Sequence, residues 1–289
     1  MTQSLGELKM NAAPIRVENE DRTAWIEVVP ERGGIVTAWH ALGQDLLYLD
    51  RDRFADPSLS IRGGIPILFP LCGNLPHNTY TVNDQTFQLK QHGFARDLPW
   101  QVFSHSESAL TLGLNANAQT LAQYPFNFAF QIAYRLQGNT LNVRSQIANQ
   151  STQDMPFSLG FHPYFAVADK SALTFDLPAT QQLDHQTLES HPYTGSLDLA
   201  VPELDVALFP VTAQKAGMGD RQQGIRLDLA YDACFTTLVV WTVDGKPYVC
   251  LEPWTAQRNA LNTGHDLLQL QPGQSWQAEV RFTVERLTA

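Results

Sequence analysis

The chain has 289 residues, of which 44% are hydrophobic, 17% charged and 10% aromatic, and this apolar fraction excludes a disordered protein. Nineteen basic and 29 acidic side chains give a formal net charge of −10. Such a surface repels phosphate backbones and anionic lipids, so we expect no nucleic-acid partner and no membrane association.

Short segments of alternating apolar and polar residues run through the chain, and their period of two predicts β-strands. In chain order the predicted strands cover residues 25–29, 110–114, 128–136, 141–147, 224–229, 236–243, 247–251 and 275–284. Two hairpin turns are indicated, at Gln137-Gly138-Asn139-Thr140 and at Asp244-Gly245. Many short strands with such turns are typical of a β-sandwich or barrel.

Helical signals are weak. Asn117 to Tyr124 is compatible with two turns that end before Pro125, and Thr255 to Asn262 with a short helix whose N-cap is Thr255. Residues 179–218 have weak periodicity and predict a long loop. Because no Pro/Gly/Ser-rich linker divides the chain, we expect one domain over 1–289, with its core at about 20–286.

Two Gly-containing clusters in the first third of the chain combine backbone freedom with polar side chains. In the first, Arg62 precedes Gly63-Gly64, which permits a close backbone approach; the alternative is a tight turn with a solvated arginine. In the second, His92 and Arg96 flank Gly-Phe-Ala in a predicted loop, where functional residues are common. The alternative there is that Arg96 pairs with Asp97 or another surface acid, while His92 is hydrogen-bonded locally.

Two further clusters contain groups that exchange protons. His162 lies between Phe161 and Pro163, and the proline restricts its backbone to an extended form. A fixed imidazole suits acid–base chemistry near neutral pH, although a buried structural histidine is the alternative. Glu252 ends an apolar strand before Pro253-Trp254, where a carboxylate is costly unless it is paired or functional.

Taken together, these donors and aromatic residues suit a sugar site. The sequence contains no glycine-rich nucleotide motif, no Gly-x-Ser-x-Gly elbow and no His-Glu-x-x-His motif. Two histidines and a carboxylate are possible metal ligands, but separations of 70 residues (162 − 92) and 90 residues (252 − 162) form no compact ligand signature. We therefore expect no metal and no cofactor.

The three cysteines, Cys72, Cys234 and Cys250, lie far apart beside apolar neighbours. They indicate reduced thiols that pack in the interior rather than react. The first 22 residues have no apolar signal region, and no segment approaches the roughly 18 apolar residues of a membrane helix. We expect a soluble cytoplasmic protein, either a monomer or a homodimer.

The order Arg62-Gly-Gly-Ile-Pro, His92-Gly-Phe-Ala-Arg96, His162-Pro-Tyr-Phe and Glu252-Pro-Trp resembles the aldose 1-epimerase (mutarotase) superfamily, near its glucose-6-phosphate 1-epimerase branch. The resemblance covers residues 20–286. It implies a galactose mutarotase-like fold, which is a large antiparallel β-supersandwich with few short helices. It also implies interconversion of the α and β anomers of a sugar without a cofactor.

By this resemblance Glu252 is the catalytic base and His162 the catalytic acid, while His92, Arg62 and Arg96 bind substrate. Asp205 is the candidate for the family's substrate-binding aspartate, with a turn aspartate as the alternative. Glu252 would take the proton from the anomeric hydroxyl while His162 protonates the ring oxygen. Burial beside Trp254 would bring the pKa of Glu252 closer to 7, and a nearby carboxylate or hydrogen bond would favour protonated His162.

The substrate is expected to be a free aldose. The alternative is a hexose 6-phosphate, with Arg62 and Arg96 binding the phosphate. A different class of function, a carbohydrate-binding module without turnover, also fits this kind of fold.

Overall fold

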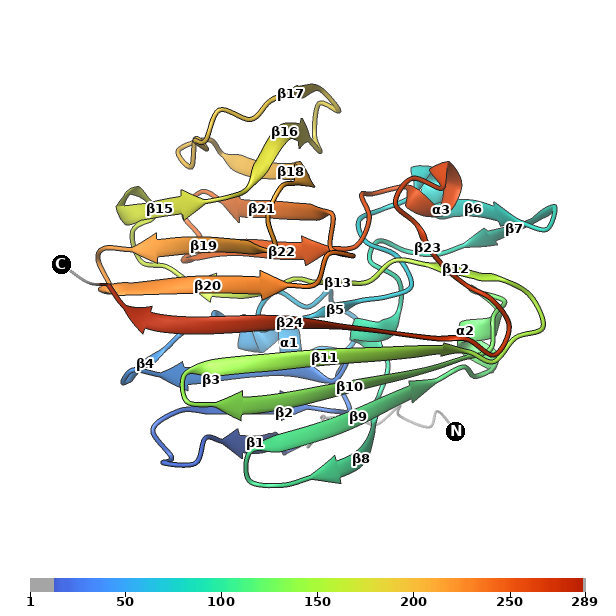
Figure 1. Cartoon of the computed structure of the whole chain (residues 1–289), viewed down its shortest axis with the longest axis horizontal. Helices are drawn as coiled ribbons and strands as arrows, with labels where there is room; N and C mark the ends of the chain where they lie inside the picture. Colours follow the sequence, from blue (N-terminus) through green and yellow to red (C-terminus); the bar gives the residue numbers. More distant parts are fainter. Residues whose placement is uncertain (1–12, 288–289) are drawn as a thin grey trace, which may run out of the picture.

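The computed structural model describes residues 13–287 and is built almost entirely from antiparallel strands (Figure 1). The all-β prediction with few short helices is therefore confirmed. The strands are β1 (Ile15–Glu18), β2 (Trp25–Val29), β3 (Ile35–Ala41), β4 (Gln44–Asp45), β5 (Ile67–Leu68), β6 (Thr79–Val82), β7 (Gln85–Gln88), β8 (Gln101–His105), β9 (Ala109–Asn115), β10 (Phe128–Gln137), β11 (Thr140–Asn149), β12 (Met155–Phe157), β13 (Gly160–Phe161), β14 (Tyr164–Ala166), β15 (Leu173–Asp176), β16 (Ala179–Asp184), β17 (Ser190–Pro192), β18 (Glu203–Val211), β19 (Lys215–Asp220), β20 (Ile225–Tyr231), β21 (Thr237–Val243), β22 (Tyr248–Trp254), β23 (Leu268–Leu270) and β24 (Ser275–Arg286). The helices are α1 (Arg51–Ala55), α2 (Ala118–Leu121) and α3 (Ala260–Thr263), with 3₁₀ turns η1 (Pro76–Asn78), η2 (Ala95–Asp97) and η3 (Lys170–Ala172).

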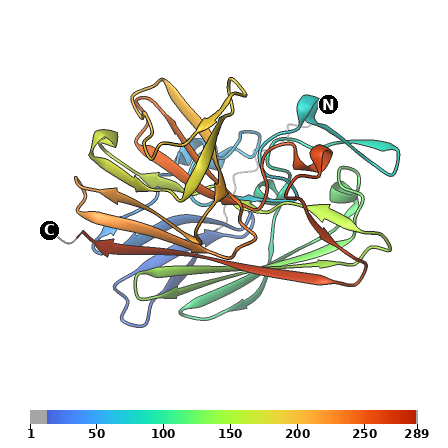
Figure 2. The same cartoon turned by 45° about the horizontal axis from the view of Figure 1, so that its top comes forward.

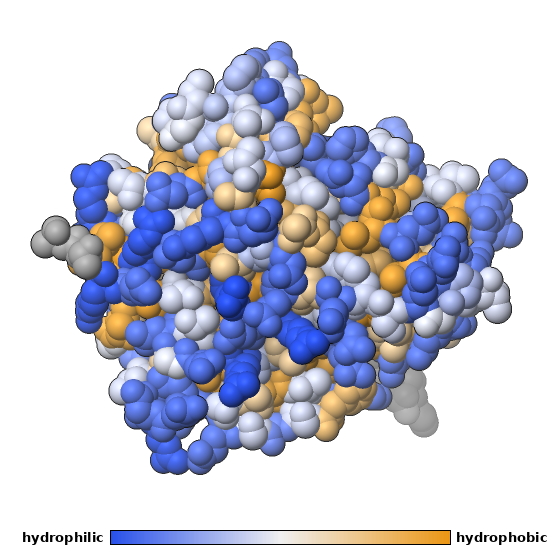
Figure 3. All heavy atoms as spheres, in the orientation of Figure 1, coloured by the Kyte–Doolittle hydropathy of each residue, from blue (hydrophilic) through white to orange (hydrophobic). Residues whose placement is uncertain are grey.

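The first large sheet has the strand order β15-β19-β20-β24-β11-β10-β9-β8. Its centre is the hairpin of β10 and β11, which pair from Phe128 with Asn149 to Gln137 with Thr140, as the turn signal predicts. Residues along both strands alternate between buried and accessible, because one face packs inward and the other meets water. Hydrophilic side chains accordingly cover most of the face seen in Figure 3.

The second large sheet has the strand order β17-β16-β18-β21-β22-β13-β5, and β14 also pairs with β22. Figure 2 separates its yellow and orange strands, in the upper part, from the long strands of the first sheet below. The hairpin of β21 and β22 turns at Asp244-Gly245, as predicted. A four-stranded sheet, β1-β2-β3-β4, and the pairs β6-β7 and β12-β23 complete the fold.

The second sheet buries side chains on both of its faces. One face supplies Leu238, Val240 and Leu251 to the main core, which also contains buried residues of the other two sheets. The opposite face carries a smaller cluster that includes Val239 and Trp241. Because successive residues of a strand point to opposite faces, this second face forms a separate surface on which the candidate site is built.

The structure corrects the prediction of a long loop over 179–218, because this segment forms β16, β17, β18 and β19. Most residues of β16 are only half-buried, so the strand lacks the strong apolar alternation that sequence patterns detect. Its pairing with β18, from Ala179 with Val211 to Asp184 with Val206, supplies the hydrogen bonds instead. Long-range pairing has here overridden a weak local signal.

Of the two predicted helices, α2 is confirmed and the second is misplaced. Asn117 caps α2 through its side chain, which accepts from the backbone of Gln119 and Thr120. By contrast, α3 begins after Asn259, and Thr255 is not its N-cap. The hydroxyl of Thr255 instead accepts from the backbone N–H of Leu159 at 2.9 Å, which ties it to the segment before β13.

Two further expectations concern the interior and the membrane. Cys72 and Cys250 are buried as predicted, whereas Cys234 is only half-buried. Within residues 13–287, the helices are too short and too polar to cross a lipid bilayer.

Candidate active site

Glu252 lies near the end of β22, which is buried along its whole length. Val249 and Leu251 point into the main core, so Cys250, Glu252 and Trp254 share the opposite face. The Glu252 residue is only 1% exposed. Its Oε2 accepts a hydrogen bond of 3.1 Å from the Trp254 indole, so the aromatic neighbour is also a polar partner.

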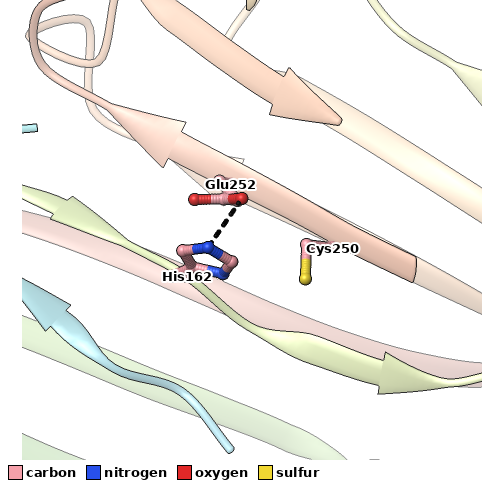
Figure 4. A group of neighbouring side chains, drawn as sticks. All are labelled: His162, Cys250 and Glu252. Atoms are coloured by element: carbon pink, nitrogen blue, oxygen red, sulfur yellow. Dashed lines mark ion pairs between the residues drawn. The ribbon is translucent and has the colours of Figure 1, made fainter. Parts of the chain in front are cut away.

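His162 faces Glu252 from the short link between β13 and β14. Its backbone N–H donates to the carbonyl of Pro66 at 3.0 Å, and its ring stacks on Tyr164 with centroids 4.7 Å apart. The imidazole Nε2 lies 3.3 Å from Glu252 Oε1, as the dashed line in Figure 4 marks. The two predicted proton-transfer groups are thus in direct contact.

His92 is held in a turn by two hydrogen bonds to one residue. Its backbone N–H donates to the carbonyl of Gly73 at 2.7 Å, and the Gly73 N–H donates to His92 Nδ1 at 3.1 Å. Because Nδ1 accepts, the neutral ring carries its proton on Nε2. The ring meets those of His162 and Trp254 edge to face, with centroids 5.5 and 5.7 Å apart.

The two predicted arginines make different contacts. Arg62 is an exposed residue, and its guanidinium lies over the Trp241 ring at 4.9 Å from the centroid. Arg96, in η2, donates from Nη2 to the carbonyl of Gln91 at 3.1 Å. Asp97 pairs with Lys90 at 2.6 Å, so Arg96 is not engaged by its neighbouring acid as the alternative interpretation expected.

Asp205 lies on β18, directly opposite Trp241 of β21 in the strand register. Its Oδ1 is 2.8 Å from Nδ1 of His185, a residue that the sequence analysis missed. Arg258, also missed, donates from Nη1 to the backbone carbonyl of His185 at 2.8 Å. Both lie in segments whose predicted structure was wrong, and neither belongs to a local motif that marks it.

All six predicted site residues line one cavity of about 310 Å³. The sequence could not show this convergence, because the six are spread from residue 62 to residue 252. Their roles remain predictions at this point. The other lining residues are Ser60, Ile61, Gly73, Asn74, Gln91, His185, Glu203, Val239, Trp241, Trp254 and Arg258.

Burial disfavours the charged forms of both predicted proton-transfer groups, Glu252 and His162. The pKa of Glu252 is raised well above its usual value by burial and then by Asp205, while the bond from Trp254 acts in the opposite direction. The pKa of His162 is lowered well below its usual value by burial and then by Arg96 and Arg62. A carboxylate lies beside His162, and a hydrogen bond to the backbone raises the pKa of the ring as predicted, but burial and the two arginines outweigh that effect.

Cys250 adds a thiol beside this pair (Figure 4). One potential ligand atom from each of His162, Cys250 and Glu252 lies within 4.8 Å of the others, which is a donor set that a divalent cation can use. Burial raises the pKa of the Cys250 thiol well above its usual value, and then Glu252 does so too. Because the thiolate is the form that binds a cation, metal binding here would require the Cys250 thiol to release its proton.

Comparison with known proteins identifies the family. The family model described as aldose 1-epimerase matches residues 18–283. The chain belongs to the aldose 1-epimerase family. This epimerase-family chain is 28% identical over 241 residues to the chromosomal LacX protein of Lactococcus lactis subsp. lactis, covering 74% of this chain and 80% of LacX. It is 26% identical over 280 residues to a Cenchrus ciliaris protein named "Putative glucose-6-phosphate 1-epimerase", covering 87% of this chain and 79% of that protein.

Solved structures confirm the galactose mutarotase-like fold of this epimerase-family chain. The Slr1438 protein of Synechocystis sp. PCC 6803 is 43% identical, with a TM-score of 0.94 over 99% of this chain and all of that one. A galactose mutarotase related enzyme of Lactobacillus acidophilus is 21% identical, with a TM-score of 0.80 over 96% of this chain and 98% of its own.

Proposed function

We propose that this chain is an aldose 1-epimerase that interconverts the α and β anomers of a free aldose. The observation that carries the proposal is the contact of 3.3 Å between His162 Nε2 and Glu252 Oε1 within a buried cavity. A buried acid–base pair beside hydrogen-bond donors is what ring opening at the anomeric carbon requires.

The reaction moves two protons. Glu252 takes the proton from the anomeric O1 hydroxyl, and His162 donates a proton to the ring oxygen O5. The C1–O5 bond breaks as the carbonyl forms at C1. Rotation about the C1–C2 bond then presents the other face of the carbonyl, and closure returns both protons in reverse.

The protonation of the pair suits this cycle. Before ring opening the pair is an imidazolium and a carboxylate; afterwards it is a neutral imidazole and a carboxylic acid. Both states hold one proton, so exchange across the 3.3 Å contact connects them without a proton from solvent. The pKa directions of Glu252 and His162 favour the uncharged state, which is the one that accompanies the open-chain sugar.

His92 and the arginines complete the site in this proposal. The Nε2–H of His92 donates to a sugar oxygen, because its Nδ1 is already occupied by Gly73. Arg62 and Arg96 donate to hydroxyls and hold the ring in place while the protons move.

A hexose 6-phosphate is the second candidate substrate, and one observation favours it. Arg62, Arg96 and Arg258 all line the cavity, and guanidinium groups bind phosphate oxygens in pairs. The name of the Cenchrus ciliaris relative agrees with this candidate. Asp205, Glu203 and Glu252 line the same cavity and oppose a dianion, so we place the free aldose first.

The test is anomer exchange measured by NMR saturation transfer or polarimetry, with glucose, galactose and glucose 6-phosphate in parallel. We expect acceleration that falls by about 10²–10⁴-fold in Glu252→Gln and in His162→Asn, because each removes one proton transfer. Glu279→Gln removes the same charge from β24, outside the cavity, and should behave like the wild type.

The other outcomes are distinct. Acceleration of the phosphate alone, weakened by Arg62→Met, would assign a hexose-6-phosphate epimerase. Binding without acceleration of any sugar would contradict the epimerase proposal and leave a carbohydrate-binding module. Loss of activity in Glu279→Gln as well would mean that the glutamate variants report stability rather than chemistry.

A further inference from the structure

His185 lines the cavity but has no part in the proton transfers proposed above. It follows β16, and its side chain is only 7% exposed. Its backbone is fixed twice, because its N–H donates to the carbonyl of Asp205 at 2.9 Å and its carbonyl accepts from Arg258 at 2.8 Å. These two hydrogen bonds fix the backbone of His185 and so hold its ring at the cavity wall.

The ring itself is oriented on two sides. Its Nδ1 lies 2.8 Å from Asp205 Oδ1, and its face stacks on Trp254 with an interplanar angle of 18°. Trp254 in turn donates to Glu252 at 3.1 Å. His185 is therefore one residue away from the catalytic base, through an indole that contacts both.

The second ring nitrogen, Nε2, has no hydrogen-bond partner in the part of the chain that the structure describes. In the neutral form of the ring, with Nδ1 donating to the Asp205 carboxylate, Nε2 is an acceptor. Among residues 13–287 no donor reaches this buried Nε2. Buried polar atoms in proteins are nearly always paired, and an exception at a cavity wall points to a bound group that supplies the missing donor.

We propose that His185 Nε2 accepts a hydrogen bond from one hydroxyl of the bound sugar and so selects which sugars bind productively. This inference rests on the proposed epimerase function, and it adds a specificity-determining residue to it. Asp205 is then a positioning residue: its Oδ1 is already occupied by His185, so it acts on the sugar through the imidazole. A hydroxyl is the fitting partner, because it is the donor that every aldose carries.

The test compares His185→Asn with His185→Gln. Asparagine places an amide N–H near the position of Nδ1, so it keeps the contact with Asp205 and removes Nε2. Glutamine places an amide oxygen near the position of Nε2 and loses the contact with Asp205. His191→Asn is the matched control, because His191 is 58% exposed on β17 and does not line the cavity.

The readout is kcat and KM for the preferred hexose and for its 2-, 3-, 4- and 6-deoxy analogues. For the wild type, we expect one analogue to lose about tenfold in kcat/KM, the cost of one hydrogen bond. In His185→Asn the parent hexose should lose about the same factor, mostly through KM, and the penalty for that one analogue should disappear. His185→Gln should restore part of the discrimination, and the other penalties should persist.

Two results would overturn the inference. One is a His185→Asn enzyme with the wild-type pattern of penalties; the other is an equal loss for every analogue, which indicates a merely structural role. If the wild type accelerates no sugar, the proposed function has failed, and the same panel is then titrated by the fluorescence of the cavity tryptophans. Loss of discrimination in binding would still support the contact, and unchanged discrimination would refute it.

Discussion

The surroundings of Glu252 act on the pKa of its carboxyl in opposite directions. Burial and Asp205 raise the pKa, while the hydrogen bond from the Trp254 indole lowers it. In the proposed reaction the reactive form combines an ionised Glu252 with a protonated His162. Because the pKa of Glu252 is raised and that of His162 is lowered, so that the uncharged pair is favoured, the acid limb of the pH–rate profile follows His162 and the alkaline limb follows Glu252.

Asp205→Asn removes the nearby negative charge, so the pKa of Glu252 falls and the alkaline limb of kcat/KM moves to lower pH. The acid limb should stay in place, because the shift of His162 comes from burial, Arg96 and Arg62. The measurement is kcat/KM from about pH 4 to 10. A movement of the alkaline limb to higher pH would contradict this assignment.

Trp254→Phe keeps an aromatic ring and removes the N–H that stabilises the ionised carboxyl. The pKa of Glu252 should rise, and the alkaline limb should move to higher pH, opposite to the effect of Asp205→Asn. Comparing both variants in one buffer series separates this electrostatic effect from a general loss of activity. If both limbs moved together, Glu252 would not be the group that sets the alkaline limb.

At the scale of elements, the site depends on the close approach of two backbone segments at Gly64. Gly64 has φ +67°, and a Cβ there would lie 2.4 Å from the carbonyl oxygen of Val36, a backbone atom that cannot move away. This contact holds the segment of Arg62 against β3, where Ile65 and Val36 form a bridge. A side chain at position 64 would separate the two.

Gly64→Ala should therefore destabilise the protein by about 3 kcal/mol, from backbone strain plus the steric clash. Gly138→Ala is the control, because Gly138 has φ +54° in the hairpin of β10 and β11 and open space around its Cβ position. It should cost only about 1 kcal/mol. Urea unfolding followed by fluorescence measures both, and equal losses would mean that the contact with Val36 is unimportant.

At the scale of the whole molecule, one core joins the three larger sheets. Its buried members include Trp39 of the four-stranded sheet, Phe130 of the first large sheet and Leu251 of the second. Because the sheets cover one another's apolar faces, separating one sheet from the core exposes apolar side chains of the other two. This shared core is the physical basis for the predicted single domain.

Unfolding in urea should therefore follow one transition, with the same midpoint by far-UV circular dichroism, tryptophan fluorescence and near-UV circular dichroism. The tryptophans lie in different sheets, for example Trp39 in β3 and Trp254 in β22, so their fluorescence reports on several parts at once. Two separate midpoints would contradict the single domain.

The sequence by itself determined the strands with strong alternation and the turns between them. β10 and β11 lie where the period of two predicts them, because one side of each faces the core and the other meets water. β21 and β22 are buried on both faces and lie where two apolar runs flank the predicted turn at Asp244-Gly245. The sequence also predicted that Glu252 is paired or functional, since a carboxylate at the end of an apolar strand is costly otherwise, and this residue lines the cavity.

Only the tertiary structure decided which residues meet. His162 and Glu252 are 90 residues apart, and the pairing of Tyr164 with Cys250 between β14 and β22 brings them into contact. The sequence did not predict that His185 and Arg258 line the cavity. His185 follows β16, which owes its structure to pairing with β18. Arg258 precedes α3, which begins later than its capping pattern predicts. Hydrogen bonding and burial act between distant residues, so a local pattern cannot contain the environment that lowers one pKa and raises another.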